Sequence, residues 1–185
     1  MNVHFRKPAL LPLLVALAAS AADAPVNAAK SSVSASFTQM KVAVDAPFKR
    51  FSGTVDFDPA RPAAAKAHIE IDTASFDLGD EDYNAEVRKP AWFDTTKYPR
   101  ATFDASGLKP LGGTRFEAAG TLNLKGKTQA LAVPVTVGSE NGAQVFDGAV
   151  TISRSAFNIG DAEWKDTVAD PVSVKFHLVV PAKHP

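Results

Sequence analysis

The chain has 185 residues, with 20 basic side chains, 20 acidic side chains and no cysteine. A balanced charge argues against the strongly basic surface by which proteins bind nucleic acid. The absence of cysteine means that the fold is held by its core and not by disulfides.

The first 22 residues have the three parts of a secretory signal peptide. Arg6 and Lys7 make a basic start, residues 8–19 form an apolar run, and small residues follow at Ser20 and Ala22. The run is shorter than the roughly 20 residues that a membrane-spanning helix needs. A buried N-terminal helix is the alternative. We expect cleavage after Ala22 and export to the periplasm.

Beyond this segment the chain predicts one domain made of strands. Residues 23–32 are small and polar and predict a flexible leader, and the domain is expected over residues 33–181. Within it, apolar and polar side chains alternate, which is typical of strands with one buried face. Asn141-Gly142 is a strong hairpin signal between two of these strands. The eight predicted strands are 33–42, 51–57, 65–73, 101–105, 116–124, 129–137, 144–152 and 172–180.

Two stretches break the alternation. Residues 80–98 are acidic and then aromatic, and predict a short helical or irregular segment that crosses one mouth of the domain. Residues 154–170 predict a long irregular connection, and long loops in compact domains are often functional.

Eight amphipathic strands joined by hairpins need covered apolar faces and paired edges, which a sandwich or a closed barrel provides. Charged outward faces disfavour a membrane barrel. We therefore expect an all-β, eight-stranded antiparallel barrel, which is a size that holds either side chains or one small ligand. Small inward residues favour an apolar cavity, although they could instead make room for aromatic neighbours. They are Gly53, Ala65, Ala67, Ala101, Ala105, Ala118, Gly120 and Gly148.

Several motifs in this order resemble the YceI-like family over nearly the whole mature chain. They are FSGTVDFDPARP (51–62), HIEIDTASFDLG (68–79), RKPAWFDTTKYPRATFDASGL (88–108), GTLNLKGKTQALAVPVTV (120–137) and ISRSAFNIG (152–160). Where many members carry His-Leu before the paired aromatics, this chain has Glu86-Val87. This form is similar to the branch found near or fused to cytochrome b561-type membrane proteins.

The resemblance implies a lipocalin-like periplasmic barrel that binds a long isoprenoid, an isoprenoid quinone or another lipid in its cavity. Because the inward positions carry almost no polar side chains, we expect a carrier or sequestering protein and not an enzyme, with no cofactor and no nucleic acid. The resemblance adds a membrane cytochrome as an expected partner. The oligomeric state is left open, a dimer included. Two alternatives remain: a redox-associated module or enzyme acting on a quinone-like substrate, and a packed barrel that binds other proteins.

The expected ligand-binding residues are inward apolar side chains together with one arginine. Trp92 and Phe93 could cover the mouth or be ordinary core aromatics, and Arg154 could hold a head group or pin a loop through Asp94 or Asp104. Trp164 and Asp166 could belong to a lid or anchor their loop. The expected set is Phe37, Phe51, Val55, Phe57, Ile69, Ile71, Trp92, Phe93, Phe103, Leu122, Phe146, Ile152, Arg154, Phe157 and Phe176.

No metal site is expected. His68, Glu70 and Asp72 share one strand face, with His177 on another strand. An alternating polar face supplies such residues by default, whereas zinc sites need three or four convergent ligands. We interpret these side chains as a solvated face.

Overall fold

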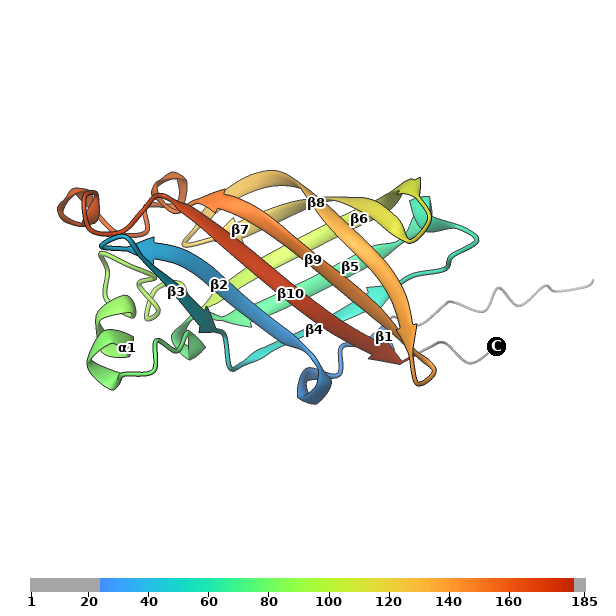
Figure 1. The fold of residues 1–185 in the computed structure, drawn as a ribbon, viewed down its shortest axis with the longest axis horizontal. Helices are drawn as coiled ribbons and strands as arrows, with labels where there is room; N and C mark the ends of the chain where they lie inside the picture. Colours follow the sequence, from blue (N-terminus) through green and yellow to red (C-terminus); the bar gives the residue numbers. More distant parts are fainter. Residues whose placement is uncertain (1–23, 182–185) are drawn as a thin grey trace, which may run out of the picture.

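The computed structural model describes residues 24–181, so the predicted signal peptide, residues 1–22, lies outside the described part. The fold is one antiparallel sheet with a single short α-helix in the described residues (Figure 1). Its strands are β1 (Ala24–Pro25), β2 (Ser32–Gln39), β3 (Val42–Pro47), β4 (Phe51–Asp56), β5 (Lys66–Asp72), β6 (Arg100–Gly112), β7 (Arg115–Leu124), β8 (Lys127–Glu140), β9 (Ala143–Ser153) and β10 (Pro171–Pro181).

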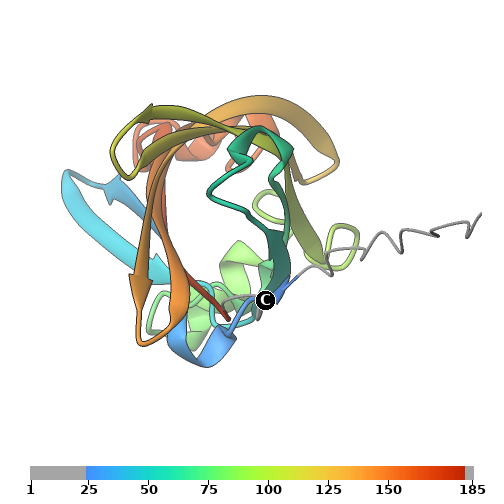
Figure 2. The same cartoon turned by 90° about the vertical axis from the view of Figure 1, so that its right-hand side faces the viewer.

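The strands follow the order β1-β4-β5-β6-β7-β8-β9-β10-β2-β3, and every neighbouring pair is antiparallel. The sheet curls around the long axis of the molecule, and α1 (Glu81–Val87) lies at the far end of the space that the sheet surrounds (Figure 2). The alternation of apolar and polar residues therefore directs one face of each strand inward.

Backbone hydrogen bonds connect the β1 edge of the curled sheet to β10 on its other side. The N–H of Val26 donates to the carbonyl of Gly53 (2.9 Å), and the N–H of Asn27 donates to the carbonyl of Val179 (2.8 Å). The segment after β1 thus joins β4 to β10. The N–H of Phe48 donates to the carbonyl of Val33 (2.9 Å), which continues the β2–β3 pairing up to the start of β4.

All eight predicted strands are present, but the sheet has ten strands, so the predicted number of eight is wrong. β1 has only two residues, too few for an alternation to show. β3 is hidden because a two-residue turn at Met40 and Lys41 carries no glycine, asparagine or proline. Residues 24–32, within the predicted flexible leader, form β1 and the 3₁₀ helix η1 (Ala28–Lys30).

The two interruptions occupy one end of the sheet. The predicted crossing segment contains α1, whose first turn is capped by Asp80: its carboxylate accepts from the N–H groups of Asp82 (2.9 Å) and Tyr83 (3.3 Å). The connection between β9 and β10 contains the 3₁₀ helices η4 (Ser155–Phe157) and η5 (Ala162–Trp164). The remaining 3₁₀ helices are η2 (Pro62–Ala64) and η3 (Thr73–Ser75). Among the described residues, no helix has the length and apolar character needed to cross a membrane.

Candidate functional site: an apolar cavity inside the curled sheet

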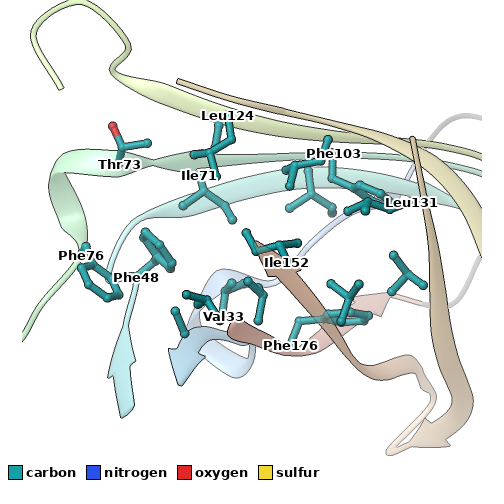
Figure 3. Close-up of a pocket in the computed structure, with 18 of the residues that line it drawn as sticks. Val33, Phe48, Ile71, Thr73, Phe76, Phe103, Leu124, Leu131, Ile152 and Phe176 are labelled. Atoms are coloured by element: carbon teal, nitrogen blue, oxygen red, sulfur yellow. The ribbon is translucent and has the colours of Figure 1, made fainter. Parts of the chain in front are cut away.

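The space inside the sheet is a cavity of about 430 Å³ with walls that are almost entirely apolar. Figure 3 shows Phe48 and Phe76 at one end and Phe103, Leu131 and Phe176 farther along, with the Thr73 hydroxyl as the one oxygen among the labelled side chains. That hydroxyl donates to the carbonyl of Tyr98 (2.9 Å), so the protein already satisfies it. Cavities of this size and character typically hold small apolar ligands.

Alternating residues of the strands build the walls. On β10 the lining residues run from Val172 to Leu178, six residue steps of roughly 3.4 Å, or about 20 Å along the strand. The intervening side chains, such as Lys175, point to the other face of the sheet. The cavity is therefore long and narrow, a shape that suits an extended hydrocarbon chain.

Twelve of the fifteen predicted ligand-binding residues line this cavity. They are Phe37, Val55, Ile69, Ile71, Trp92, Phe93, Phe103, Leu122, Phe146, Ile152, Arg154 and Phe176.

The other three predicted residues lie elsewhere. Phe57 packs edge-on against the rings of Phe116 and Phe146, with centroids 5.8 and 5.6 Å apart, and belongs to the core beside the cavity. Phe157 is the last residue of η4 in the β9–β10 connection and is 1% exposed. Phe51 borders a separate polar depression beside Arg50.

Sequence reasoning missed an aromatic cluster at the α1 end. Phe48, Phe76 and Phe93 pack against one another in tilted and edge-to-face pairs, with centroids 4.8 to 6.1 Å apart, and all three line the cavity. Only Phe93 was predicted. Phe48 and Phe76 lie just outside the alternating segments, so no periodic pattern marks them, although they form an isolated bridge with each other.

The small inward residues divide into two groups. The alanines Ala65, Ala67, Ala101, Ala105 and Ala118 line the cavity, as expected.

The inward glycines do not line it. A Cβ placed on Gly120 would lie 2.4 Å from Cζ of Phe103, and one on Gly148 would lie 2.4 Å from Cζ of Phe176. A Cβ on Gly53 would lie 2.4 Å from the carbonyl oxygen of His68. Gly120 and Gly148 therefore make room for aromatic neighbours, as the alternative interpretation expected, whereas Gly53 makes room for the backbone of the next strand and for Ile69.

Arg154 is 5% exposed and lies at the α1 end of the cavity wall. Its Nε donates to the carbonyl of Ala169 (3.2 Å), and its two terminal nitrogens donate to four further carbonyls. A guanidinium has five N–H donors, so none is left for a ligand. Arg154 therefore pins the β9–β10 connection, as one alternative expected, but through backbone carbonyls and not through Asp94 or Asp104. The four carbonyls are those of Ile159 (2.7 Å), Gly160 (3.1 Å), Trp164 (3.2 Å) and Val168 (2.7 Å).

Two lysines hold the same end together, Lys125 in the β7–β8 turn and Lys127 at the start of β8. Lys125 Nζ donates to the carbonyls of Pro90 (2.7 Å) and Asn158 (2.6 Å), which belong to the two irregular segments. Lys127 Nζ donates to the carbonyl of Ala156 (3.0 Å) and to Oδ1 of Asn158 (2.9 Å). Burial lowers the pKa of Lys125. The crossing segment and the β9–β10 connection thus form one fastened cap.

Trp92 and Trp164 meet inside this cap, with ring centroids 5.1 Å apart, and both line the cavity. Trp92 comes from the crossing segment and Trp164 from η5, so the pair joins the two irregular segments. The Nε1 of Trp92 is buried without a hydrogen-bond partner in the described structure. Both rings thus form part of the cavity wall at the α1 end.

The few polar lining residues lie mostly at the α1 end. Gln39, the last residue of β2, lies there. Tyr83 and Glu86 line the cavity from α1, and Glu86 is ion-paired with Lys89. Lys66, at the start of β5, is the polar lining residue of the opposite end. This distribution makes the α1 end the more polar end of the cavity.

The polar strand residues considered for a metal site are each paired separately. His68 Nδ1 lies 2.6 Å from Oδ1 of Asp104, Glu70 pairs with Arg100 (2.9 Å), and Asp72 pairs with Arg50 (2.8 Å). Within residues 24–181, no three His, Asp or Glu side chains gather in a manner that could hold a metal ion.

Comparison with known proteins agrees with this geometry. The model of the family described as the YceI-like domain matches residues 25–180, so the chain belongs to the YceI-like family. A UPF0312 protein of Shewanella baltica is 31% identical over 124 residues, or 65% of each chain. The chain spans between 44% and 65% of the length of the first curated relatives it matches.

Two solved structures share the fold. Burkholderia cenocepacia BcnA is 51% identical with a TM-score of 0.81, covering 83% of this chain and 98% of that one. A Saccharophagus degradans domain described as polyisoprenoid-binding has a TM-score of 0.72 at 18% identity, covering 86% of this chain and 98% of that one. At this identity the second likeness shows the fold alone.

Proposed function

We propose that this protein binds one long-chain apolar ligand, an isoprenoid, an isoprenoid quinone or another lipid, in the cavity of the curled sheet. The main observation that supports this proposal is a cavity of about 430 Å³ whose apolar walls run about 20 Å along β10. Family membership and the polyisoprenoid-binding description of one structural neighbour support the ligand class. We further propose that residues 1–22 export the protein, so that it carries or sequesters the ligand in the periplasm.

Binding would rest on the hydrophobic effect. Each methylene moved from water into the cavity contributes about 0.8 kcal/mol, so a chain of several isoprene units needs few polar contacts. Cavity length and width would then set specificity. The cavity disfavours the packed-barrel alternative, which requires a filled interior. The membrane cytochrome partner stays a prediction.

The experiment is native mass spectrometry of the periplasmic protein, followed by solvent extraction and lipid identification. We expect a discrete added mass that extracts as an isoprenoid, a quinone or an acyl chain. If the protein is ligand-free, polyprenols and ubiquinone are added to it. Failure of all of these to bind would overturn the proposal.

Ala118 and Ala119 provide a matched pair of variants. Ala118 lines the cavity and is 4% exposed, whereas its neighbour Ala119 points outward and is exposed. Ala118→Phe should abolish ligand retention and Ala118→Leu should weaken it, while Ala119→Phe should retain ligand like the wild type. Normal retention by a folded Ala118→Phe variant would mean that the ligand lies outside the cavity.

A further inference from the structure

Exposed large apolar side chains are concentrated at one end of the molecule. In the described residues, Met40 is 73% exposed, Val42 65% and Tyr83 61%, and Leu111 follows at 47%. The first three belong to the β2–β3 hairpin tip and to α1, both at the left end of Figure 1. Leu111 lies beside the β6–β7 turn at the opposite end.

These side chains lie next to residues that line the cavity, beside the cap. Val44 lines the cavity, and Val42 shares its face of β3 because it lies two residues away. Tyr83 lines the cavity and is also exposed, so it stands at the rim. The N–H of Met40 donates to the carbonyl of Thr167 (2.7 Å), next to the lining residue Val168. Apolar surface therefore continues from the cavity to the outside at this end.

The hairpin tip has a sequence that its backbone does not favour. Met40 and Lys41 have φ of 49° and 66°. Lys125-Gly126, at 49° and 71°, and Asn141-Gly142, at 49° and 78°, make turns of the same kind with the glycine that such φ values favour. Residues other than glycine held at positive φ store strain, and such strain clusters at functional sites. The turn itself therefore does not account for the Met-Lys sequence at this tip.

We propose that this rim, formed by Met40, Lys41, Val42 and Tyr83, docks the protein on a phospholipid bilayer so that ligand passes directly between bilayer and cavity. The proposal rests on the proposed function. The apolar side chains would enter the boundary between head groups and acyl chains, and the exposed Lys41 between them would reach lipid phosphates.

The physical need for docking follows from the ligand. Every methylene that must cross water during transfer slows the transfer about fourfold. A mouth seated on the bilayer removes this barrier for the whole chain. α1 places the exposed acids Glu81 and Asp82 beside the rim, and these repel anionic lipid. We therefore expect docking to depend on the insertion of apolar side chains and not on attraction to anionic lipid alone.

The test uses full-length mature protein and vesicles of phosphatidylcholine, with and without phosphatidylglycerol, that carry ubiquinone. The test variant is Met40→Asn with Lys41→Gly and Val42→Ser, which gives the turn its preferred residues and removes the exposed apolar side chains. The control is Leu111→Ser, an exposed apolar residue at the other end. Measured are cosedimentation with vesicles, the rate of ubiquinone transfer, and equilibrium binding of ubiquinone added from ethanol without vesicles.

We expect the rim variant to lose cosedimentation and to take up ubiquinone from vesicles at least about tenfold more slowly, with equilibrium binding unchanged. Leu111→Ser should match the wild type in all three measurements. If the rim variant cosediments with vesicles and transfers ubiquinone as the wild type does, docking is overturned even if ubiquinone binds. Docking is also overturned if the wild type is a dimer, the rim variant is a monomer, and both transfer ubiquinone at the same rate. A second copy of the chain would then cover the rim.

Absence of ubiquinone binding by the wild type from ethanol would instead count against the proposed function. Cosedimentation of the wild type, lost in the rim variant, would still establish the docking surface in that case.

Discussion

The ring of Phe103 lies so close over Gly120 that a Cβ on the glycine would sit 2.4 Å from Cζ and 2.7 Å from Cε2 of the ring. β6 and β7 carry these residues two register positions apart, since Phe103 pairs with Leu122 and Ala105 pairs with Gly120. Phe103 also lines the cavity. The glycine therefore determines where a wall aromatic lies, and the empty space is bounded by the ring and not by the glycine.

We expect Gly120→Ala to destabilise the protein by about 1–3 kcal/mol, because the Phe103 ring and the Asp104 carbonyl must both move away from the added methyl group. Urea unfolding measures the loss. Gly138→Ala is the matched control, since Gly138 also lies in a strand and nothing stands within 4 Å of its added Cβ. Equal stability of the two variants would show that the Phe103 ring is not seated on Gly120.

Arg154→Lys should cost about 3 kcal/mol of unfolding free energy. An ammonium has three donors, so it leaves at least two of the five carbonyls unsatisfied, each at about 1–3 kcal/mol. Amide hydrogen exchange should become faster in residues 155–169, the segment that Arg154 holds through these carbonyls, and stay unchanged in β7. Unchanged exchange in that connection would contradict the pinning role.

Gly160→Ala should act through the same arginine. Gly160 has φ of +69°, and a Cβ there would lie 2.5 Å from Nη1 of Arg154. Alanine is strained in this left-handed backbone conformation, and its methyl group displaces the guanidinium. We therefore expect the free energy of unfolding to fall by at least about 2 kcal/mol. Combined with Arg154→Lys, the losses should fall clearly short of their sum. A fully additive double variant would show that the two residues act independently.

Stability should depend on pH through Asp77. A hydrogen bond from Lys49, followed by those from Asn84 and the Gly79 N–H, lowers the pKa of Asp77 from 3.8 to about 2. Because the folded-state pKa is the lower one, this stabilisation is complete above pH about 4 and is lost as the pH falls through about 2. Asp77 joins the β3–β4 corner to α1, so its loss should loosen the cap over the cavity.

The melting temperature of Asp77→Asn, measured from pH 7 to pH 2, tests this dependence. We expect the variant to melt below the wild type at neutral pH and the difference to shrink between pH about 4 and about 2. Asp45→Asn, in the exposed pair with Ser36, serves as the control for charge alone. A difference that stays constant across this range would contradict the pKa shift.

Much of the fold could be predicted because alternation is a local property of the chain. On β10, Val172, Val174, Phe176 and Leu178 line the cavity as their spacing indicates. Local pattern could not find β3, since the Met40–Lys41 turn carries no turn-forming residue. It also could not find Phe48 and Phe76, which reach the cavity from the ends of strands, where alternation stops.

The sequence by itself determined eight of the ten strands, which of their faces turn inward, and the family to which the chain belongs, because each depends on residues close together in the chain. Only the tertiary structure decided what the small residues do. Ala118 leaves space inside the sheet, whereas Gly148 gives its space to Phe176. It also decided that Arg154 serves backbone carbonyls and not a ligand. The difference is physical: a cavity and the partners of a buried cation are set by distances between strands, and sequence spacing does not contain those distances.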